Sequence, residues 1–194
     1  MTIKPAHERK QKMTSLALEF DHLTDGLTGE DFRKTFRHHP AGVAVITGDD
    51  GTGPVALTAT SVISISAEPP LIVFSASALS SSTSTLRSCD SLVVHLLSSE
   101  QHWLAKLGAT SGVDRFSDLE AWTRLATGEP RYLGVPVWIR ARVAAQISAG
   151  ASTLFVLHAL ESHCDVADAA GATTPLVYHD REWHGLTSKS KIEV

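Results

Sequence analysis

The sequence predicts a mainly β, antiparallel α+β domain, either a barrel or another β-rich arrangement. Six or seven runs rich in β-branched residues alternate with turn clusters, and only two short segments have a helical pattern. The strands also lack the helical crossovers that a doubly wound parallel sheet requires. These observations favour strands that are joined by hairpins.

The first half of the chain contains one helix and several strands. Thr28 is a good N-cap, Phe32 and Phe36 recur at i and i+4, and Pro40 ends the pattern, so we expect a helix over residues 28–39. Turn-forming residues then separate extended segments. The predicted strands are 42–47, 55–66 and 71–75, with a turn at 48–54.

The second half opens with a Ser-rich loop and a second helix. Ser98 and Gln101 form a capping box that starts this helix, and Gly108 is the expected C′ residue at its end. The segment 110–130 is irregular. The other predicted elements are the loop 77–84, a helical turn at 85–88 and strands at 91–97, 135–147, 153–166, 174–178 and 183–186.

The length of 194 residues fits a single domain with terminal extensions. We expect an N-terminal extension at 1–26, with a short helix around 15–22 or an arm, then the domain at 27–186 and a C-terminal tail at 187–194. The net charge of −4 argues against a nucleic-acid partner. No segment offers the continuous apolar run of a membrane span. Two cysteines without a CxxC pair fit a reducing, cytoplasmic location.

Motifs for hydrolysis, nucleotide binding and metal binding are missing from the sequence. It has no GxGxxG, GxxxxGK[ST], HExxH or GxSxG pattern. His158, His163 and Cys164 do not have the spacing of a known ligand set, and His38 and His39 fit the end of a helix. We therefore expect no metal site and nominate no catalytic acid, base or nucleophile.

Two hydroxyl-rich segments are the strongest positive signal. In residues 58–66 small hydroxyl side chains alternate with apolar ones, so one strand face has no bulky side chain to block a flat ligand. The loop 75–83 offers hydroxyls and free N–H groups that suit a phosphate. From composition alone, a solvent-exposed Ser loop beside an edge strand is an equally good interpretation.

Several separated motifs give the chain its family resemblance. Residues 32–47, 57–71, 86–97, 114–116 and 175–181 occur in the order found in the flavin reductase-like, FMN-binding split-barrel family, and the segment 57–71 is the most specific. The resemblance covers residues 31–186. It implies a homodimeric split β-barrel that binds FMN, or FAD, and takes a hydride from NADH or NADPH. It also implies that reduced flavin passes to a partner monooxygenase.

The resemblance also implies site residues. The ring and ribityl chain of the flavin are expected along one strand, and the phosphate is expected at the Ser-rich loop, with an Arg-Phe motif near the flavin. The residues on the strand are Thr58, Ala59, Thr60, Ser61, Ser64 and Ser66; those in the loop are Ser81, Ser82 and Thr83; those of the motif are Arg115 and Phe116.

The chain departs from the family at one motif. Where the family often has Gly-Asp-His-Thr before its penultimate strand, this chain has Gly150, Ala151, Ser152 and Thr153, and Leu157 replaces a later Gly. The leading hypothesis is an NAD(P)H:flavin oxidoreductase, in which the cofactors carry the hydride chemistry. The missing Asp-His pair leaves two alternatives open. One is a flavin-binding protein with weak NAD(P)H oxidase activity that acts on another substrate or carries flavin, and the other is a barrel without cofactor.

Overall fold

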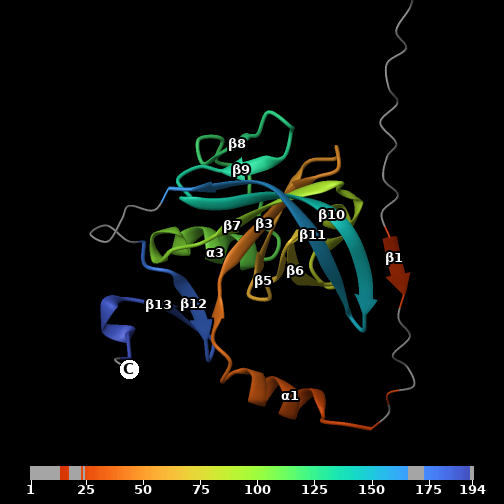
Figure 1. Cartoon of the computed structure of the whole chain (residues 1–194), viewed down its shortest axis with the longest axis vertical. Helices are drawn as coiled ribbons and strands as arrows, with labels where there is room; N and C mark the ends of the chain where they lie inside the picture. Colours follow the sequence, from red (N-terminus) through yellow and green to blue (C-terminus); the bar gives the residue numbers. More distant parts are fainter. Residues whose placement is uncertain (1–13, 18–22, 24, 166–172, 193–194) are drawn as a thin grey trace, which may run out of the picture.

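The computed structural model describes residues 14–17, 23, 25–165 and 173–192, which form a strongly curved antiparallel sheet with small helices outside it (Figure 1). The helices are α1 (Gly29–Phe36), α2 (Thr83–Ser88), α3 (His102–Ala109) and the short 3-10 turns η1 (Ser99–Gln101) and η2 (Ser188–Ser190). The strands are β1 (Thr14–Ala17), β2 (Ala41–Gly42), β3 (Ala44–Asp49), β4 (Pro54–Ala59), β5 (Ile63–Ala67), β6 (Pro70–Ser77), β7 (Ser91–Leu96), β8 (Trp122–Arg124), β9 (Pro130–Tyr132), β10 (Val137–Ala149), β11 (Ser152–Cys164), β12 (Leu176–His179) and β13 (Glu182–Gly185).

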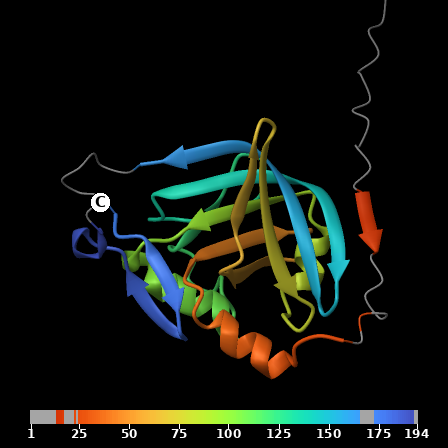
Figure 2. The same cartoon turned by 60° about the horizontal axis from the view of Figure 1, so that its bottom comes forward.

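The main sheet has the order β4-β3-β7-β10-β11-β6-β5, and every pair along this path is antiparallel. The long β10–β11 hairpin forms its centre, and the β5–β6 hairpin projects from the body (Figure 2). β4 and β5 follow each other in sequence but are the two ends of this path. The strands therefore curl into a barrel with an open seam between β4 and β5, as the split-barrel prediction requires.

The inside of the barrel is apolar because alternate residues of each strand point inward. Phe74 on β6 stacks on Phe155 on β11 with 4.6 Å between the ring centroids, and both rings are fully buried. Small and β-branched side chains from the other strands fill the rest of this cluster. The alternation that predicted the strands is thus the pattern that builds the core.

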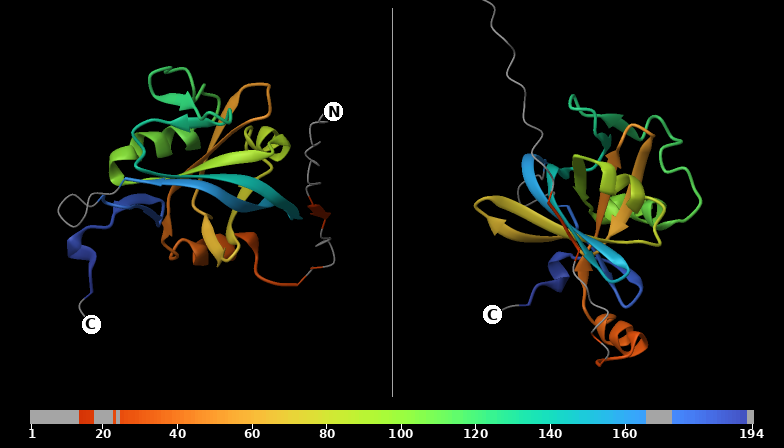
Figure 3. Two further views of the ribbon diagram at one scale, coloured as in Figure 1. Left: turned by 45° about the horizontal axis from the view of Figure 1, so that its top comes forward. Right: turned by 90° about the vertical axis from the view of Figure 1, so that its right-hand side faces the viewer.

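A second core lies between the barrel and the segment that follows α3. Leu104 of α3, Phe116 and Tyr132 of β9 are its large buried members. β8 and β9 pair into a small hairpin over this side, and α1 lies at the opposite end of the molecule (Figure 3). This core fixes α3 against β4, the strand that carries predicted site residues.

Most predicted helices and strands are confirmed, but several bounds are corrected. The extended segment predicted over 55–66 is two strands, so Thr58 and Ala59 lie on β4 whereas Ser64 and Ser66 lie on β5, at the other end of the sheet path. The helix predicted over 28–39 ends at Phe36. Residues 15–17, expected in a short helix, belong to β1, and 18–22 lie outside the described residues. Gly108 is not a C′ residue: it lies inside α3, which ends at Ala109. The segment 110–130, expected to be irregular, contains β8 and leads into β9. No helix among the described residues has both the length and the apolar character to cross a membrane.

Candidate functional site

Several predicted flavin-binding hydroxyls are bonded to the protein's own backbone. Thr58 on β4 donates to the carbonyl of Ala105 on α3 at 2.7 Å. Ser61 accepts from the N–H of Ser75 at 2.9 Å and donates to the carbonyl of the same residue at 3.1 Å. Ser75 lies on β6 just beyond the part that pairs with β5. The Ser61 hydroxyl therefore satisfies the backbone N–H and carbonyl of Ser75 that a longer β5 would have bonded.

Two hydroxyls of the Ser-rich loop, those of Ser82 and Thr83, also donate to backbone carbonyls. Ser82 is almost fully buried and donates to the carbonyl of Ala56 on β4 at 2.8 Å. Thr83 is also buried and donates to the carbonyl of Ser77 at 2.7 Å. Ser82 therefore ties the loop to β4, and Thr83 closes the loop on itself.

The remaining predicted hydroxyls are available to a ligand. Thr60 and Ser64 are exposed at the seam, Ser66 is half-buried on β5, and Ser81 is exposed in the loop. None of these four side chains has a hydrogen bond within the described part of the chain. Ala59, by contrast, is buried in the barrel core. The structure thus divides the predicted set into residues that hold the seam and residues that face outward.

The Ser-rich loop and α2 surround an open pocket of about 370 Å³. Two of the predicted phosphate residues, Ser81 and Thr83, line it, whereas Ser82 does not. Arg87 is the one charged side chain in its lining. The complete lining is Ala78, Leu79, Ser80, Ser81, Thr83, Ser84, Arg87 and Thr153.

Arg87 was not predicted as a site residue. It follows Thr83 by four residues, so a helix that begins at Thr83 carries both side chains on one face. The sequence prediction started this helix two residues late, at 85, and so lost that relationship. The donor set of one guanidinium and several hydroxyls is the one that proteins use for phosphate.

The tip of the β10–β11 hairpin contacts the Ser-rich loop directly. The N–H of Ala78 donates to the carbonyl of Ala151 at 2.9 Å, and Gly150 turns the chain with φ of +56°. Thr153 follows on β11 and enters the pocket lining. The motif at 150–153, where the chain departs from the family that it resembles, therefore lies beside the predicted phosphate loop.

Arg115 and Phe116 have structural contacts. The Arg115 guanidinium donates to the carbonyls of Thr110 at 2.6 Å and Leu107 at 3.3 Å, which closes the end of α3. A further bond of 3.4 Å reaches the hydroxyl of Ser82. Phe116 stacks on Tyr132 with 5.2 Å between centroids and is buried. Their predicted contact with flavin stays a prediction.

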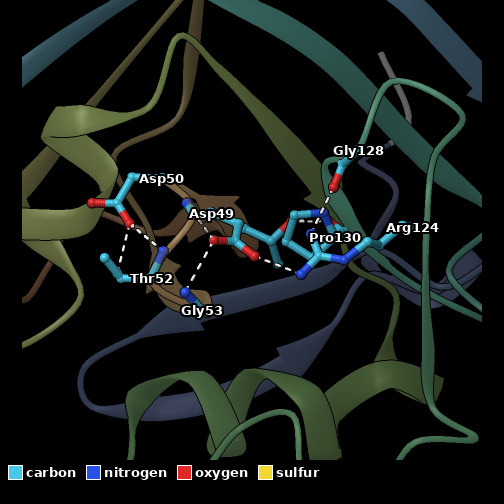
Figure 4. Close-up of polar contacts among 9 residues, drawn as sticks. Asp49, Asp50, Thr52, Gly53, Arg124, Gly128 and Pro130 are labelled. Atoms are coloured by element: carbon cyan, nitrogen blue, oxygen red, sulfur yellow. Dashed lines mark hydrogen bonds and ion pairs between the residues drawn. The ribbon is translucent and has the colours of Figure 1, made fainter.

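A second pocket, of about 520 Å³, lies at the C-terminal end of α2, and two of its acidic lining residues form ion pairs: Asp49 with Arg124, and Glu129 with Arg140. Asp49 accepts from the N–H groups of Gly51 and Gly53 and pairs with Arg124 at 2.5 Å (Figure 4). Burial opposes ionisation here, but these contacts lower the pKa of Asp49 below its usual value. The region is a structural clamp between the β3–β4 turn and the β8–β9 hairpin.

Neither the buried cysteine Cys89 nor any cluster of metal-binding side chains in the described part of the chain supplies a further candidate site. Burial raises the pKa of the Cys89 thiol to about 12, so this thiol is protonated at neutral pH. Among the described residues, no three His, Cys, Asp or Glu side chains lie close enough together to hold a metal ion. The pocket beside Arg87 and the outward hydroxyls at the seam are therefore the candidate site.

Comparison with known proteins places this site in context. The model of a flavin reductase like domain matches residues 36–187. An NADH:FMN oxidoreductase of Rhodococcus erythropolis is 43% identical over 165 residues, which is 85% of this chain and 85% of that protein.

Two solved structures have the same fold. A flavin reductase domain protein from Arthrobacter sp. FB24 has a TM-score of 0.77 and 28% identity, and the match covers 86% of this chain and 100% of that one. BorF, the flavin reductase component of a bacterial two-component tryptophan halogenase, has a TM-score of 0.71 and 28% identity over 82% of this chain and 98% of that one. The span matched by the domain model, 36–187, contains the pocket and the seam.

Proposed function

The chain belongs to the family of flavin reductase like domains and is an NAD(P)H:flavin oxidoreductase, and we propose that it reduces FMN with NADH for a separate monooxygenase. The pocket beside Arg87 is the observation that carries the choice of flavin. Its one charged lining residue is a cation, and its polar lining is made of hydroxyls. This donor set fits the terminal phosphate of FMN, because a phosphate dianion needs a counter-charge and several hydrogen-bond donors.

The seam supplies the place for the flavin ring. Thr60 follows β4 and Ser64 and Ser66 lie on β5, and none of their hydroxyls has a hydrogen bond within the described part of the chain, whereas Ser81 lines the pocket. The seam residues would hold the flavin ring, and Arg87 with the loop hydroxyls would hold its phosphate. Thr58, Ser61, Ser82 and Thr83 support the site from behind through their backbone bonds.

The protein's task in the reaction is to position two flat molecules and exclude water. Flavin and reduced nicotinamide, when bound, would supply the hydride chemistry, which needs contact geometry more than a side-chain acid or base. His95, the most deeply buried histidine, has both ring nitrogens bonded inside the core and faces no pocket. The outward hydroxyls orient the ring, and the backbone bonds behind them keep its platform rigid.

The proposal includes a homodimer and a cytoplasmic location. Phe32 and Phe36 on α1 are half exposed, as are Ile63 and Ile65 on β5, and such large apolar side chains support a contact with a second copy. The two cysteines have free thiols, which supports a reducing compartment. The relation to BorF, the flavin reductase component of a two-component halogenase, and to the reductase component of a 4-nitrophenol 4-monooxygenase of Rhodococcus opacus supports a separate monooxygenase that uses the reduced flavin.

Steady-state kinetics with two flavins tests the assignment. In Arg87→Ala we expect the KM for FMN to rise about 10- to 100-fold, as the loss of a charge-assisted phosphate contact predicts, with an unchanged KM for riboflavin. Arg142→Ala, an exposed arginine on β10 outside the pocket lining, is the matched control. An equal effect on both flavins, or none on either, would contradict a phosphate in this pocket. Parallel assays with NADH and NADPH test the choice of donor.

A further inference from the structure

The strand β7 pairs with only the first half of one edge of β10 and leaves the second half of that edge unpaired in the main sheet. β7 pairs with β10 only from Val137 to Arg142, and the last bond on this side joins the N–H of Val143 to the carbonyl of Asp90 at 2.9 Å. β10 itself continues to Ala149. A free edge of this kind exposes a row of unpaired N–H and C=O groups that accept another strand.

The N-terminal segment occupies this open half. β1 runs parallel to β10, with Thr14 opposite Ala145 and Ala17 opposite Ser148 (Figure 1). It is the one parallel pair among the described strands of the main sheet. A four-residue parallel strand makes few hydrogen bonds, and each adds little net stability, so this pairing is easily opened compared with the rest of the sheet.

The same four residues of β10 stand behind the candidate phosphate pocket. Gln146 donates from Nε2 to the carbonyl of Arg87 at 2.8 Å and so holds the last turn of α2. Ser148 pairs across β10–β11 with Thr153, which lines the pocket. The stretch of β10 that receives β1 is therefore in contact with two residues of the pocket lining.

We propose that residues 14–17 act as a detachable strap: when they are docked on β10, they hold Arg87 and Thr153 in the arrangement that binds FMN. The effect on FMN rests on the proposed function, whereas the docking of the strap does not. When the strap leaves, the edge of β10 at 145–148 loses its paired strand. Gln146 and Ser148 then become more mobile, and so do the pocket residues Arg87 and Thr153 that they contact. Because coupling between two binding events is reciprocal, FMN in the pocket must also favour the docked strap.

Hydrogen exchange on the full chain without flavin tests the docking. In the double variant Ser15→Pro/Leu16→Pro two consecutive N–H groups are lost, and one of them must point toward β10 because N–H directions alternate along a strand. We expect faster exchange at those amides of 145–148 that point toward β1, with unchanged exchange in β3 and β7. Ser15→Ala/Leu16→Ala, which keeps both N–H groups, is the matched control. Equal exchange at 145–148 in the proline variant and the wild type would overturn the docking.

Flavin titration tests the coupling. We expect the Kd for FMN to rise about 5-fold or more in the proline variant and to stay constant in the alanine variant. FMN added to the wild type should slow exchange at 145–148. Faster exchange in the proline variant without any change in FMN affinity would overturn the coupling. The kinetics of Arg87→Ala decide separately whether FMN phosphate uses this pocket, so failure of the proposed function and failure of the strap are distinguishable.

Discussion

The backbone N–H of Tyr132 donates to Nε2 of His95 over 3.1 Å, and both residues are completely buried. Since Nε2 is the acceptor, the imidazole proton is on Nδ1, which donates to the carbonyl of Val45 at 3.0 Å. One neutral ring therefore connects β3, β7 and β9. Burial lowers the pKa of His95 to about 4, well below the value of 6.5 for a free histidine.

This pKa predicts a loss of stability in mild acid. Between pH 6.5 and about 4, His95 is protonated in the unfolded chain but neutral in the folded chain. The free energy of unfolding therefore falls as the pH falls through this window. We expect this residue to account for a decrease of about 3 kcal/mol by pH 4. Urea unfolding at pH 7.5 and 4.5 measures it. His95→Gln cannot titrate, so a variant with the same pH dependence as the wild type would contradict the assignment.

Gly108 should resist replacement because α3 approaches β4 closely at this point. A Cβ at Gly108 would lie 2.3 Å from Oγ1 of Thr58 and 3.1 Å from its backbone nitrogen. We expect Gly108→Ala to lower the free energy of unfolding by about 1–3 kcal/mol through overpacking, although alanine is the better helix former. The double variant Gly108→Ala/Thr58→Ala removes the hydroxyl from the clash. Thermal unfolding should show partial recovery, and additive losses would disprove a direct clash.

Ser61 should affect both stability and flavin binding. Ser61→Ala removes the two hydrogen bonds to the Ser75 backbone, and we expect a loss of about 1–3 kcal/mol in the free energy of unfolding. The KM for FMN should rise because the seam beside the flavin platform loosens. Ser64→Ala, at an exposed hydroxyl without a hydrogen bond in the described part of the chain, is the comparison for stability alone. A variant Ser61→Ala with wild-type stability would show that its hydroxyl does not hold the seam.

Asp49 and Arg124 should respond unequally although they form one ion pair. Arg124 is 45% exposed, so Arg124→Ala should change the free energy of unfolding by less than about 1 kcal/mol. Asp49→Ala also leaves the N–H groups of Gly51 and Gly53 without their acceptor, which predicts a loss of about 1–3 kcal/mol (Figure 4). Chemical unfolding of both variants measures the difference. Equal losses would show that the ion pair, not the turn, dominates.

The strands of the barrel were predictable because their alternation directly reflects burial. The helix start at Thr28 and the capping box at Ser98 were predictable for a similar reason, since both depend on side chains within one turn. β1, β8 and β9 were not predicted. Each has three or four residues and exists through pairing with a distant segment, which local propensity does not encode.

The sequence pointed to the Ser-rich loop that lines the pocket, but not to the structural role of each residue. Composition marked the hydroxyl-rich segments, yet Ser61 and Ser81 look alike in sequence although one holds the backbone and the other faces a pocket. Ser61 holds the backbone because β5 does not extend far enough to pair with Ser75, which leaves the Ser75 carbonyl and N–H for the Ser61 hydroxyl. The place of Gly108 beside Thr58 likewise depends on how closely α3 packs, and a sequence does not state this distance.

The closure of the seam by serine hydroxyls has a consequence for divergence among relatives. Position 61 must keep a group that both donates and accepts, and position 82 must keep a donor, whatever flavin is used. The side chains at positions 60, 64 and 81 make no hydrogen bond within the described part of the chain, so the residue type there can vary among relatives. Sequence variation along the seam should therefore be lowest at the side chains that hydrogen-bond the backbone.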